Sequence, residues 1–299
     1  MVSGAPVQDP QQEVIAFLCR SASYGLDDRP VEIVETHCSV VFLAGDRAYK
    51  LKRAVKYPYL DFSTPALRQA ACEAELALNR RTAPQLYLEV RAIGRRPDGT
   101  VGWYREGAPL DWVVVMRRFD QELLLDRIAE AGKLSAPLLL ALAAHIAEFH
   151  DHAEPCPQQG GAAAMIEVAA TNIGILRDCR SAGFPAQPID ALHERIRGEL
   201  ARAGSRLDRR RAGGKVRRCH GDLHLRNICV VDGQPVLFDC IEFSEAIASV
   251  DVLYDLAFLL MDLDHRGHRD LANLVLNRYL DLTAEDDGLA ALPAFLALR

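Results

Sequence analysis

The sequence predicts an α+β protein with two unequal lobes, a β-rich first third and a helical remainder. Three observations support this fold class. Runs rich in β-branched and aromatic residues, separated by turn signals, extend from residue 31 to residue 119. Apolar residues at helical spacing dominate from residue 134 onwards, and one strand pair, 228–238, is embedded among them. Strands followed by helices, rather than alternating with them, are typical of α+β proteins.

The first lobe is expected to combine a short N-terminal helix, an antiparallel sheet and one long helix. Ser63 or Thr64 would cap the longer helix, and Pro65 suits its first turn. The character of the chain changes after Phe119, so we place the lobes at 1–118 and 119–299. The elements expected in the first lobe are a helix at 11–20, strands at 31–36, 38–46 and 48–54, a helix at 62–81, and strands at 86–96, 100–106 and 112–119.

The second lobe is expected to be mainly helical. The basic run 206–218 is interpreted as a helix end followed by a solvated loop. The apolar end, 289–299, carries no stop signal, which suggests that the sequence is interrupted inside a helix. Helices are predicted at 134–155, 165–179, 189–211, 249–265 and 269–282.

Composition excludes several classes of protein. The 299 residues are 49% hydrophobic and 25% charged, which is ample for a packed core, and the net charge of −6 gives no basic footprint for nucleic acid. Eight cysteines without a CxxC pair indicate reduced thiols. The N-terminus lacks the basic region of a signal peptide, and no apolar run approaches a membrane span. We therefore expect a cytoplasmic protein that binds neither nucleic acid nor membrane.

The stretch "CHGDLHLRNICVVDGQPVLFDCIEF" (219–243) carries most of the functional signal. Asp232-Gly233 between two apolar runs predicts a hairpin with a two-residue turn. Its register would bring Asp239 beside Asn227 at the open end, with Asp222 in the loop that precedes the first strand. The expected pairs are Val231 with Gln234, Cys229 with Val236 and Asn227 with Phe238.

Two carboxylates and one amide at a strand end suit a hard cation such as Mg²⁺, which takes oxygen ligands and borrows others from phosphates. A carboxylate beside the metal can align and deprotonate a hydroxyl, which is what phosphoryl transfer requires. A rival interpretation is a metal-dependent hydrolase that uses His220, Asp222 and His224 as ligands. No HExxH motif or second histidine cluster supports that rival. A further alternative is a non-catalytic, nucleotide-binding regulatory module.

"HGDLHLRN" followed by "VLFDCIEF" resembles the catalytic loop and metal-binding motif of the aminoglycoside phosphotransferase family, within the protein-kinase-like superfamily. "YDLAFLL" resembles the helix start that follows in these enzymes. "YKLKRAVKYPYLDFST" and "CEAELALNRR" resemble a bacterial subgroup whose members often carry a C-terminal P-loop ATP-binding domain. No GxxxxGK[ST] motif occurs here, so such a domain would be a partner outside this chain.

The resemblance implies a bilobal kinase-like fold and a phosphotransferase that uses ATP and Mg²⁺ on a small-molecule hydroxyl, such as that of an aminoglycoside or sugar. It implies that Asp222 is the catalytic residue in loop 220–227 and that Asn227 and Asp239 bind Mg²⁺. His220 would support the loop, and Asp255 would brace it from the following helix. The short segment between Asp239 and that helix leaves no room for a long activation segment, which favours a small acceptor over a protein.

In the first lobe the resemblance requires a strand lysine paired with a helix glutamate. Lys50 and Lys52 are two residues apart and share one face of a strand, so spacing leaves both open. Glu75 is the preferred partner, with Glu73 as the alternative. Backbone near Met116–Arg118 would meet adenine. No GxGxxG motif precedes the lysines, so "THCSVVFL" (36–43) would cover the phosphates.

Overall fold

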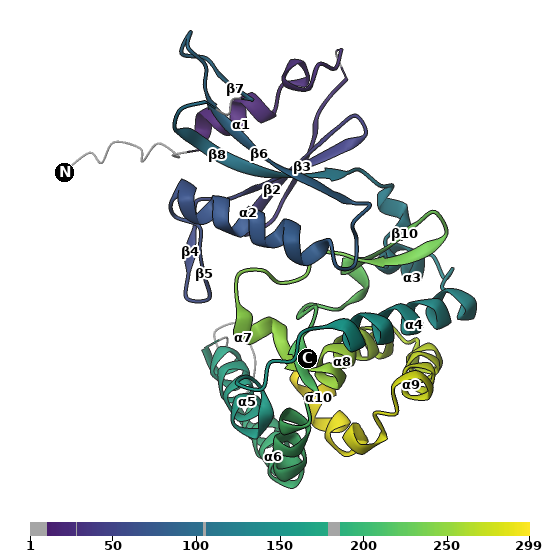
Figure 1. Cartoon of the computed structure of the whole chain (residues 1–299). Coiled ribbons are helices and arrows are strands. Elements are labelled where there is room, and N and C mark those ends of the chain that lie inside the picture. Colours follow the sequence, from purple (N-terminus) through teal and green to yellow (C-terminus); the bar gives the residue numbers. More distant parts are fainter. Residues whose placement is uncertain (1–10, 28, 104–105, 179–185) are drawn as a thin grey trace, which may run out of the picture. The chain divides into compact units, whose positions relative to one another are not determined.

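The computed structural model describes residues 11–27, 29–103, 106–178 and 186–299. Contacts divide the chain into two compact units. The first unit is Met1–Asp120 together with Glu242–Ser244, and the second is Gln121–Ile241 together with Glu245–Arg299. The first contains an antiparallel sheet and the second is mainly helical, which confirms the predicted α+β class (Figure 1).

The first unit is built on a six-stranded sheet in which every neighbouring pair is antiparallel. Its strands, in the order β1-β2-β3-β8-β6-β7, are β1 (Glu32–Glu35), β2 (Ser39–Ala44), β3 (Arg47–Lys52), β8 (Pro109–Arg117), β6 (Tyr87–Arg95) and β7 (Val101–Trp103). The predicted antiparallel arrangement of the first three strands is confirmed. Of the strand expected at 100–106, Tyr104 and Arg105 lie outside the described residues.

A small hairpin of β4 (Lys56–Tyr57) and β5 (Leu60–Asp61) also belongs to this unit, and no pattern in the sequence predicts it. Each of its strands has two residues, which is too short to show an alternating pattern. A 3₁₀ turn at Ser21–Tyr24 follows the first helix.

Helices cover both faces of this sheet. Successive strand residues point to opposite faces, so each strand offers side chains to a helix on either side. Tyr49 and Leu51 of β3 join the apolar core that includes Phe17 of α1 (Gln12–Leu18). Lys50 and Lys52 point the other way, toward α2 (Pro65–Asn79), which crosses the sheet in Figure 1. Helix α2 begins at a defined cap, since the Thr64 hydroxyl accepts a hydrogen bond from the Leu67 N–H at 3.3 Å.

The second unit has one large apolar core to which helices α3–α6 and α8–α10 all contribute. Two short strand pairs, β9 with β12 and β10 with β11, complete it. Its helices are α3 (Leu125–Glu130), α4 (Ala136–His152), α5 (Gly161–Asp178), α6 (Ala186–Ala212), α7 (Glu245–Ala248), α8 (Val252–His265), α9 (Arg269–Thr283) and α10 (Leu292–Leu298), with 3₁₀ turns at Gln121–Leu123, Leu225–Asn227 and Asp286–Ala291.

The predicted hairpin is confirmed at residue level. Strands β10 (Ile228–Val231) and β11 (Gln234–Leu237) pair Val231 with Gln234 and Cys229 with Val236. Asp232 and Gly233 both have positive φ, 51° and 79°, as a type I′ turn requires. One step further along, the Phe238 N–H donates to the Asn227 carbonyl at 3.0 Å, so Asp239 follows directly after a residue paired with Asn227.

Two expectations about secondary structure were wrong. The end of the basic run forms β9 (Val216–Arg218), and it pairs with β12 (Ser249–Asp251), where a helix start was expected. Helix α8 begins only at Val252 because the Asp251 carboxylate accepts from the Leu253 N–H at 2.9 Å. Of the helix expected at 165–179, Cys179 lies outside the described residues. No helix within the described ranges combines the length and apolar character needed to cross a bilayer.

Candidate active site

The loop that leads into the hairpin, 219–227, is held in place by the buried carboxylate of Asp255. Asp255 lies on α8 among apolar neighbours and is fully buried. Its two oxygens accept the backbone N–H groups of His220 at 3.1 Å and Gly221 at 2.8 Å. The Nε2 of His150 lies 3.1 Å from the same carboxylate, and the His150 Nδ1 lies 2.8 Å from the Tyr279 hydroxyl. Several hydrogen bonds therefore compensate the burial of Asp255.

These contacts hold the pKa of Asp255 low. Burial alone would raise this pKa, but the hydrogen bond and charge of His150, together with His220, outweigh burial and lower it to about 2. The carboxylate is thus ionised at neutral pH, and it can accept both loop amides as strong, charge-assisted hydrogen bonds.

Gly221 is required by the path of this loop. Its φ is +85°, a backbone conformation that residues with a Cβ rarely adopt. A Cβ at this position would lie 3.1 Å from the Ala248 Cα and 3.3 Å from the Ile241 Cβ. The glycine therefore lets the loop turn sharply next to Ala248, and in this conformation its backbone N–H donates to the Asp255 carboxylate.

Asp222 emerges from this braced loop with its carboxylate held in place. The Asn227 side-chain amide donates to Asp222 Oδ2 at 2.8 Å and to the Asp222 carbonyl at 2.9 Å. His224 Nε2 lies 3.3 Å from the same Oδ2. The Asp222 side chain remains 38% exposed, whereas Asn227 is 7% exposed. A carboxylate that is oriented from behind and partly open to solvent can accept a proton from an approaching group.

The pKa of Asp222 lies below its usual value. Burial raises it, but the hydrogen bond and charge of His224, the charge of His220 and the hydrogen bond from Asn227 lower it by more. At neutral pH the group is therefore an acceptor of hydrogen bonds rather than a donor.

Asp239 stands at the other side of the hairpin mouth, one residue beyond the Asn227–Phe238 pair. Its φ of 65° places a non-glycine residue in the left-handed region. Aspartate enters this region more readily than most residues, yet the conformation still costs free energy. Such local strain occurs preferentially where a side chain must point in a fixed direction for function.

The donor set at this mouth fits a magnesium ion. Asn227 uses its amide N–H groups on Asp222, which leaves its oxygen, Oδ1, as the atom of this side chain that could bind a cation. Asp239 would add a carboxylate oxygen. An amide oxygen and a carboxylate are hard ligands, and so few protein ligands are typical of a Mg²⁺ that also binds phosphates and water. We call Asp222, Asn227 and Asp239 the loop cluster.

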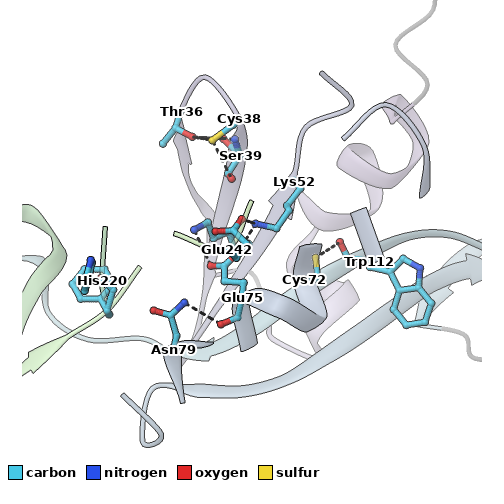
Figure 2. Close-up of polar contacts among 12 residues, drawn as sticks. Thr36, Cys38, Ser39, Lys52, Cys72, Glu75, Asn79, Trp112, His220 and Glu242 are labelled. Atoms are coloured by element: carbon cyan, nitrogen blue, oxygen red, sulfur yellow. Dashed lines mark hydrogen bonds and ion pairs between the residues drawn. The ribbon is translucent and has the colours of Figure 1, made fainter. Parts of the chain in front are cut away.

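The first unit holds a second charged group, the lysine cluster, which consists of Lys50, Lys52, Glu75 and Glu242. Lys50 Nζ donates to Glu75 Oε1 at 2.8 Å, and Lys52 Nζ donates to Glu75 Oε2 at 2.5 Å. Lys52 also donates to Glu242 Oε1 at 2.5 Å. Figure 2 shows the carboxylates of Glu75 and Glu242 turned toward the Lys52 ammonium.

Burial distinguishes the two lysines. The side chain of Lys52 is 1% exposed and that of Lys50 is 13% exposed. Burial opposes the charge of Lys52, but Glu75 and Glu242 outweigh it and raise the Lys52 pKa above its usual value. Burial also raises the pKa of Glu242, against the opposing effect of Lys52. The alternative helix partner, Glu73, instead accepts a hydrogen bond from Gln69 on the exposed side of α2.

The segment expected to meet adenine has part of its backbone already engaged. Met116 pairs with Ala48 and Tyr87 inside the sheet. The Arg117 N–H donates to the Leu86 carbonyl at 2.8 Å, and the Arg118 N–H donates to the Asp46 carbonyl at 2.9 Å. An adenine contact at Met116–Arg118 stays a prediction, and it would have to use other backbone groups than these two N–H donors.

The hydrolase interpretation finds no support in the loop. His220 Nε2 lies 2.9 Å from the Phe238 carbonyl, and its Nδ1 accepts from the Asp222 N–H at 3.3 Å. His224 uses Nε2 on Asp222, and its Nδ1 accepts from the Arg226 N–H at 3.2 Å. Each ring nitrogen of the two histidines thus has a hydrogen-bond partner, so these residues orient the loop.

Sequence reasoning missed two contributors to these clusters. Glu242 is not among the site residues expected from the sequence, because spacing gives no sign that it reaches Lys52, 190 positions earlier. His150, on helix α4, is not among the expected site residues either. The sole signal in its favour was a histidine at a position that the helical pattern of α4 buries.

Two of the similar curated proteins are uncharacterised proteins of Mycobacterium tuberculosis and Mycobacterium bovis. Each is 32% identical over 265 residues, which cover 86% of this chain and 51% of the relative. The chain therefore spans about half the length of these relatives.

Similar solved structures include a choline kinase from Cryptosporidium parvum, with a TM-score of 0.55 and 10% identity, covering 95% of this chain and 86% of that one. The aminoglycoside phosphotransferase APH(4)-Ia gives a TM-score of 0.53 and 14% identity, covering 96% of this chain and 88% of that one. At these identities the likeness establishes the kinase-like fold. The model of the phosphotransferase enzyme family matches residues 40–292, which include the loop cluster and the lysine cluster. This chain is therefore a member of the phosphotransferase enzyme family.

Proposed function

We propose that this protein transfers the γ-phosphate of ATP to a hydroxyl group of a small molecule, with Mg²⁺ as the metal. The observation that carries the proposal is the loop cluster. An ionised and partly exposed Asp222 is oriented by Asn227 and His224, and the hairpin that positions Asn227 continues directly into Asp239. Family membership supports the reaction class.

In this proposal Asp222 accepts a hydrogen bond from the acceptor hydroxyl and takes its proton as the new oxygen–phosphorus bond forms. The bond between the γ-phosphorus and the bridging oxygen breaks, and ADP leaves with that electron pair. Asn227 and Asp239 would hold Mg²⁺, which supplies charge neutralisation for the phosphates. Lys52 or Lys50 would contact phosphate oxygens, with Glu75 as the fixed partner.

Positioning and electrostatics would supply most of the rate in such a reaction, because phosphoryl transfer leaves little covalent chemistry to the protein. Asp255 contributes indirectly, by holding the two amides that set the path of the loop. His220 contributes in the same way through the Phe238 carbonyl.

The test is ADP release by the purified protein with ATP, Mg²⁺ and a panel of hydroxyl compounds. Sugars, aminoglycosides and choline belong in the panel, since one similar structure is a streptomycin–ATP complex of an aminoglycoside phosphotransferase and another is a choline kinase. With an active acceptor, Asp222→Asn should lower turnover about 10²–10⁴-fold, the usual share of a positioned base. Its affinity for ADP should stay within about twofold.

The matched control is Asp232→Asn, an equal change of charge at the exposed turn of the same hairpin, where turnover should be unaffected. Wild-type turnover in Asp222→Asn would refute the role given to this residue. ADP binding without ADP release on any acceptor would favour the rival, a non-catalytic nucleotide-binding module. No specific observation on the described residues favours that rival.

Two further expectations from the sequence remain proposals. A P-loop ATP-binding domain would follow this domain in the full-length protein. A GxxxxGK[ST] motif encoded downstream in the same open reading frame would support this. A cytoplasmic location, inferred from the cysteines, would be tested by cell fractionation.

A further inference from the structure

Glu242 occupies the position on Lys52 where the proposed function requires a phosphate. The Lys52 side chain is 1% exposed and the Glu242 side chain 7% exposed, so the 2.5 Å contact between them is shielded from solvent. Glu242 reaches this position from segment 242–244, which packs with the first unit. The Lys52 ammonium thus lies between two carboxylates, with the Phe62 ring centroid 5.0 Å away.

The formal charge of the lysine cluster is balanced. Lys50 and Lys52 carry two positive charges, and Glu75 and Glu242 carry two negative charges. A nucleotide phosphate on Lys52 would add a third anion next to one buried ammonium. Like charges at such distances repel strongly where water is excluded. One carboxylate therefore has to leave before a phosphate can take full advantage of Lys52.

Glu242 is the carboxylate that can leave. Glu75 is bonded to both lysines and lies within the regular helix α2. Glu242 lies in an irregular segment between Asp239 and α7, where the backbone can change direction without breaking a helix or strand. Segments of this kind absorb most conformational changes in switching proteins.

We infer that Glu242 is a built-in competitor for the phosphate position on Lys52, displaced when nucleotide binds. This inference rests on the proposed function, since it concerns the same lysine. Glu242 lies three positions after Asp239, so its displacement would couple nucleotide binding to the segment that follows the candidate metal ligand. The carboxylate sets the nucleotide affinity below the value that Lys52 and Glu75 alone would give.

The test compares ADP affinity by calorimetry in the wild type, Glu242→Gln and Glu13→Gln. Glutamine keeps the shape and an oxygen acceptor for Lys52, but it removes the competing charge. Glu242→Gln should therefore bind ADP at least about tenfold more tightly, and its KM for ATP should fall. Glu13→Gln breaks an exposed ion pair with Arg95 in the same unit and makes the same charge change, so its affinity should equal that of the wild type.

A purely structural role for Glu242 predicts the opposite sign, because a disturbed Lys52 binds phosphate less well. Unchanged or weaker ADP binding by folded Glu242→Gln would overturn the inference.

If Glu242→Gln does not fold, Glu242→Asp provides the test. It shortens the reach to Lys52 and should tighten binding, and unchanged or weaker binding would overturn the inference. ADP binding that is normal in the wild type and equal in all variants overturns this inference alone. An absence of ADP binding in every protein, wild type included, overturns the proposed function as well.

Discussion

The lysine cluster and the loop cluster are stabilised in different ways. In the lysine cluster, side-chain charges face one another, and the partners Lys52 and Glu242 are 190 positions apart. In the loop cluster, the Asp222 and Asn227 side chains are five positions apart, and the loop is held by main-chain amides on one carboxylate, Asp255. The first group depends on side-chain contacts between distant residues, whereas the second combines a local side-chain contact with a main-chain brace from a residue 34 positions beyond Gly221.

The two clusters therefore lose stability through different kinds of substitution. Removing one member of a buried ion group leaves an uncompensated charge, which is among the most costly single changes in a protein. Removing a brace from a loop leaves unsatisfied amides at a smaller cost, but it moves the residues that the loop presents.

The largest loss of stability is expected for Lys52→Met. This change leaves the Glu75 and Glu242 carboxylates without their buried ammonium, and it should lower the free energy of unfolding by about 3–5 kcal/mol. Lys50→Met should cost clearly less, because the Lys50 side chain is 13% exposed, so its ion pair with Glu75 is partly open to solvent. Urea unfolding of both variants measures the difference, and equal losses would show that burial does not distinguish the two lysines.

Asp255→Asn should have the next largest effect. An amide has one oxygen and cannot replace the carboxylate toward two loop amides and His150, so the loss should be about 2–3 kcal/mol. Turnover should fall as well, because the loop no longer holds Asp222 in one orientation. Asp264→Asn, an exposed carboxylate on the same helix, is the control and should change neither quantity. Unfolding and ADP-release assays on both variants measure these effects.

The contribution of Asp255 to stability should also depend on pH. The pKa of Asp255 in the folded protein is about 2, below its ordinary value of 3.8, so its ionised form stabilises the fold above about pH 4. This contribution of about 2 kcal/mol should be lost as pH falls from about 4 to about 2. The measurement is the stability difference between wild type and Asp255→Asn across that range. A difference that does not shrink on acidification would contradict the assigned pKa.

The smallest effect is expected at the cap of α2, the helix that carries Glu75. Thr64→Ala removes the hydroxyl that accepts the Leu67 N–H and should cost about 1 kcal/mol. Thr64→Ser keeps the cap and should retain most of the stability. Thermal unfolding of the two variants is sufficient, and equal midpoints would show that the cap contributes nothing measurable.

The local parts of the structure could be predicted from the sequence. The Asp232-Gly233 pair predicted the register of β10 and β11, because it marks a two-residue hairpin turn in which both residues have positive φ. Once the two turn residues are known, the pairing of the strand residues on either side follows by counting outwards from the turn. Spacing alone placed Lys50 and Lys52 on the same strand face. These inferences involve residues that are neighbours in the chain or across one turn.

The remaining features depend on contacts that no local pattern encodes. Strands β9 and β12 have three residues each, which is too short for an alternating signal, and they exist because they pair with each other. Glu242 and His150 look like ordinary polar residues until the fold brings them to Lys52 and Asp255. Such placements depend on tertiary packing, which overrides local propensity.

The brace at Asp255 accepts main-chain N–H groups, which every residue except proline carries. Side chains on the outer side of the loop, such as Arg226, which is 72% exposed, can therefore be exchanged in evolution without loosening that brace. In the proposed phosphotransferase, changes at such positions would leave the orientation of Asp222 intact while the outer surface of the loop varies.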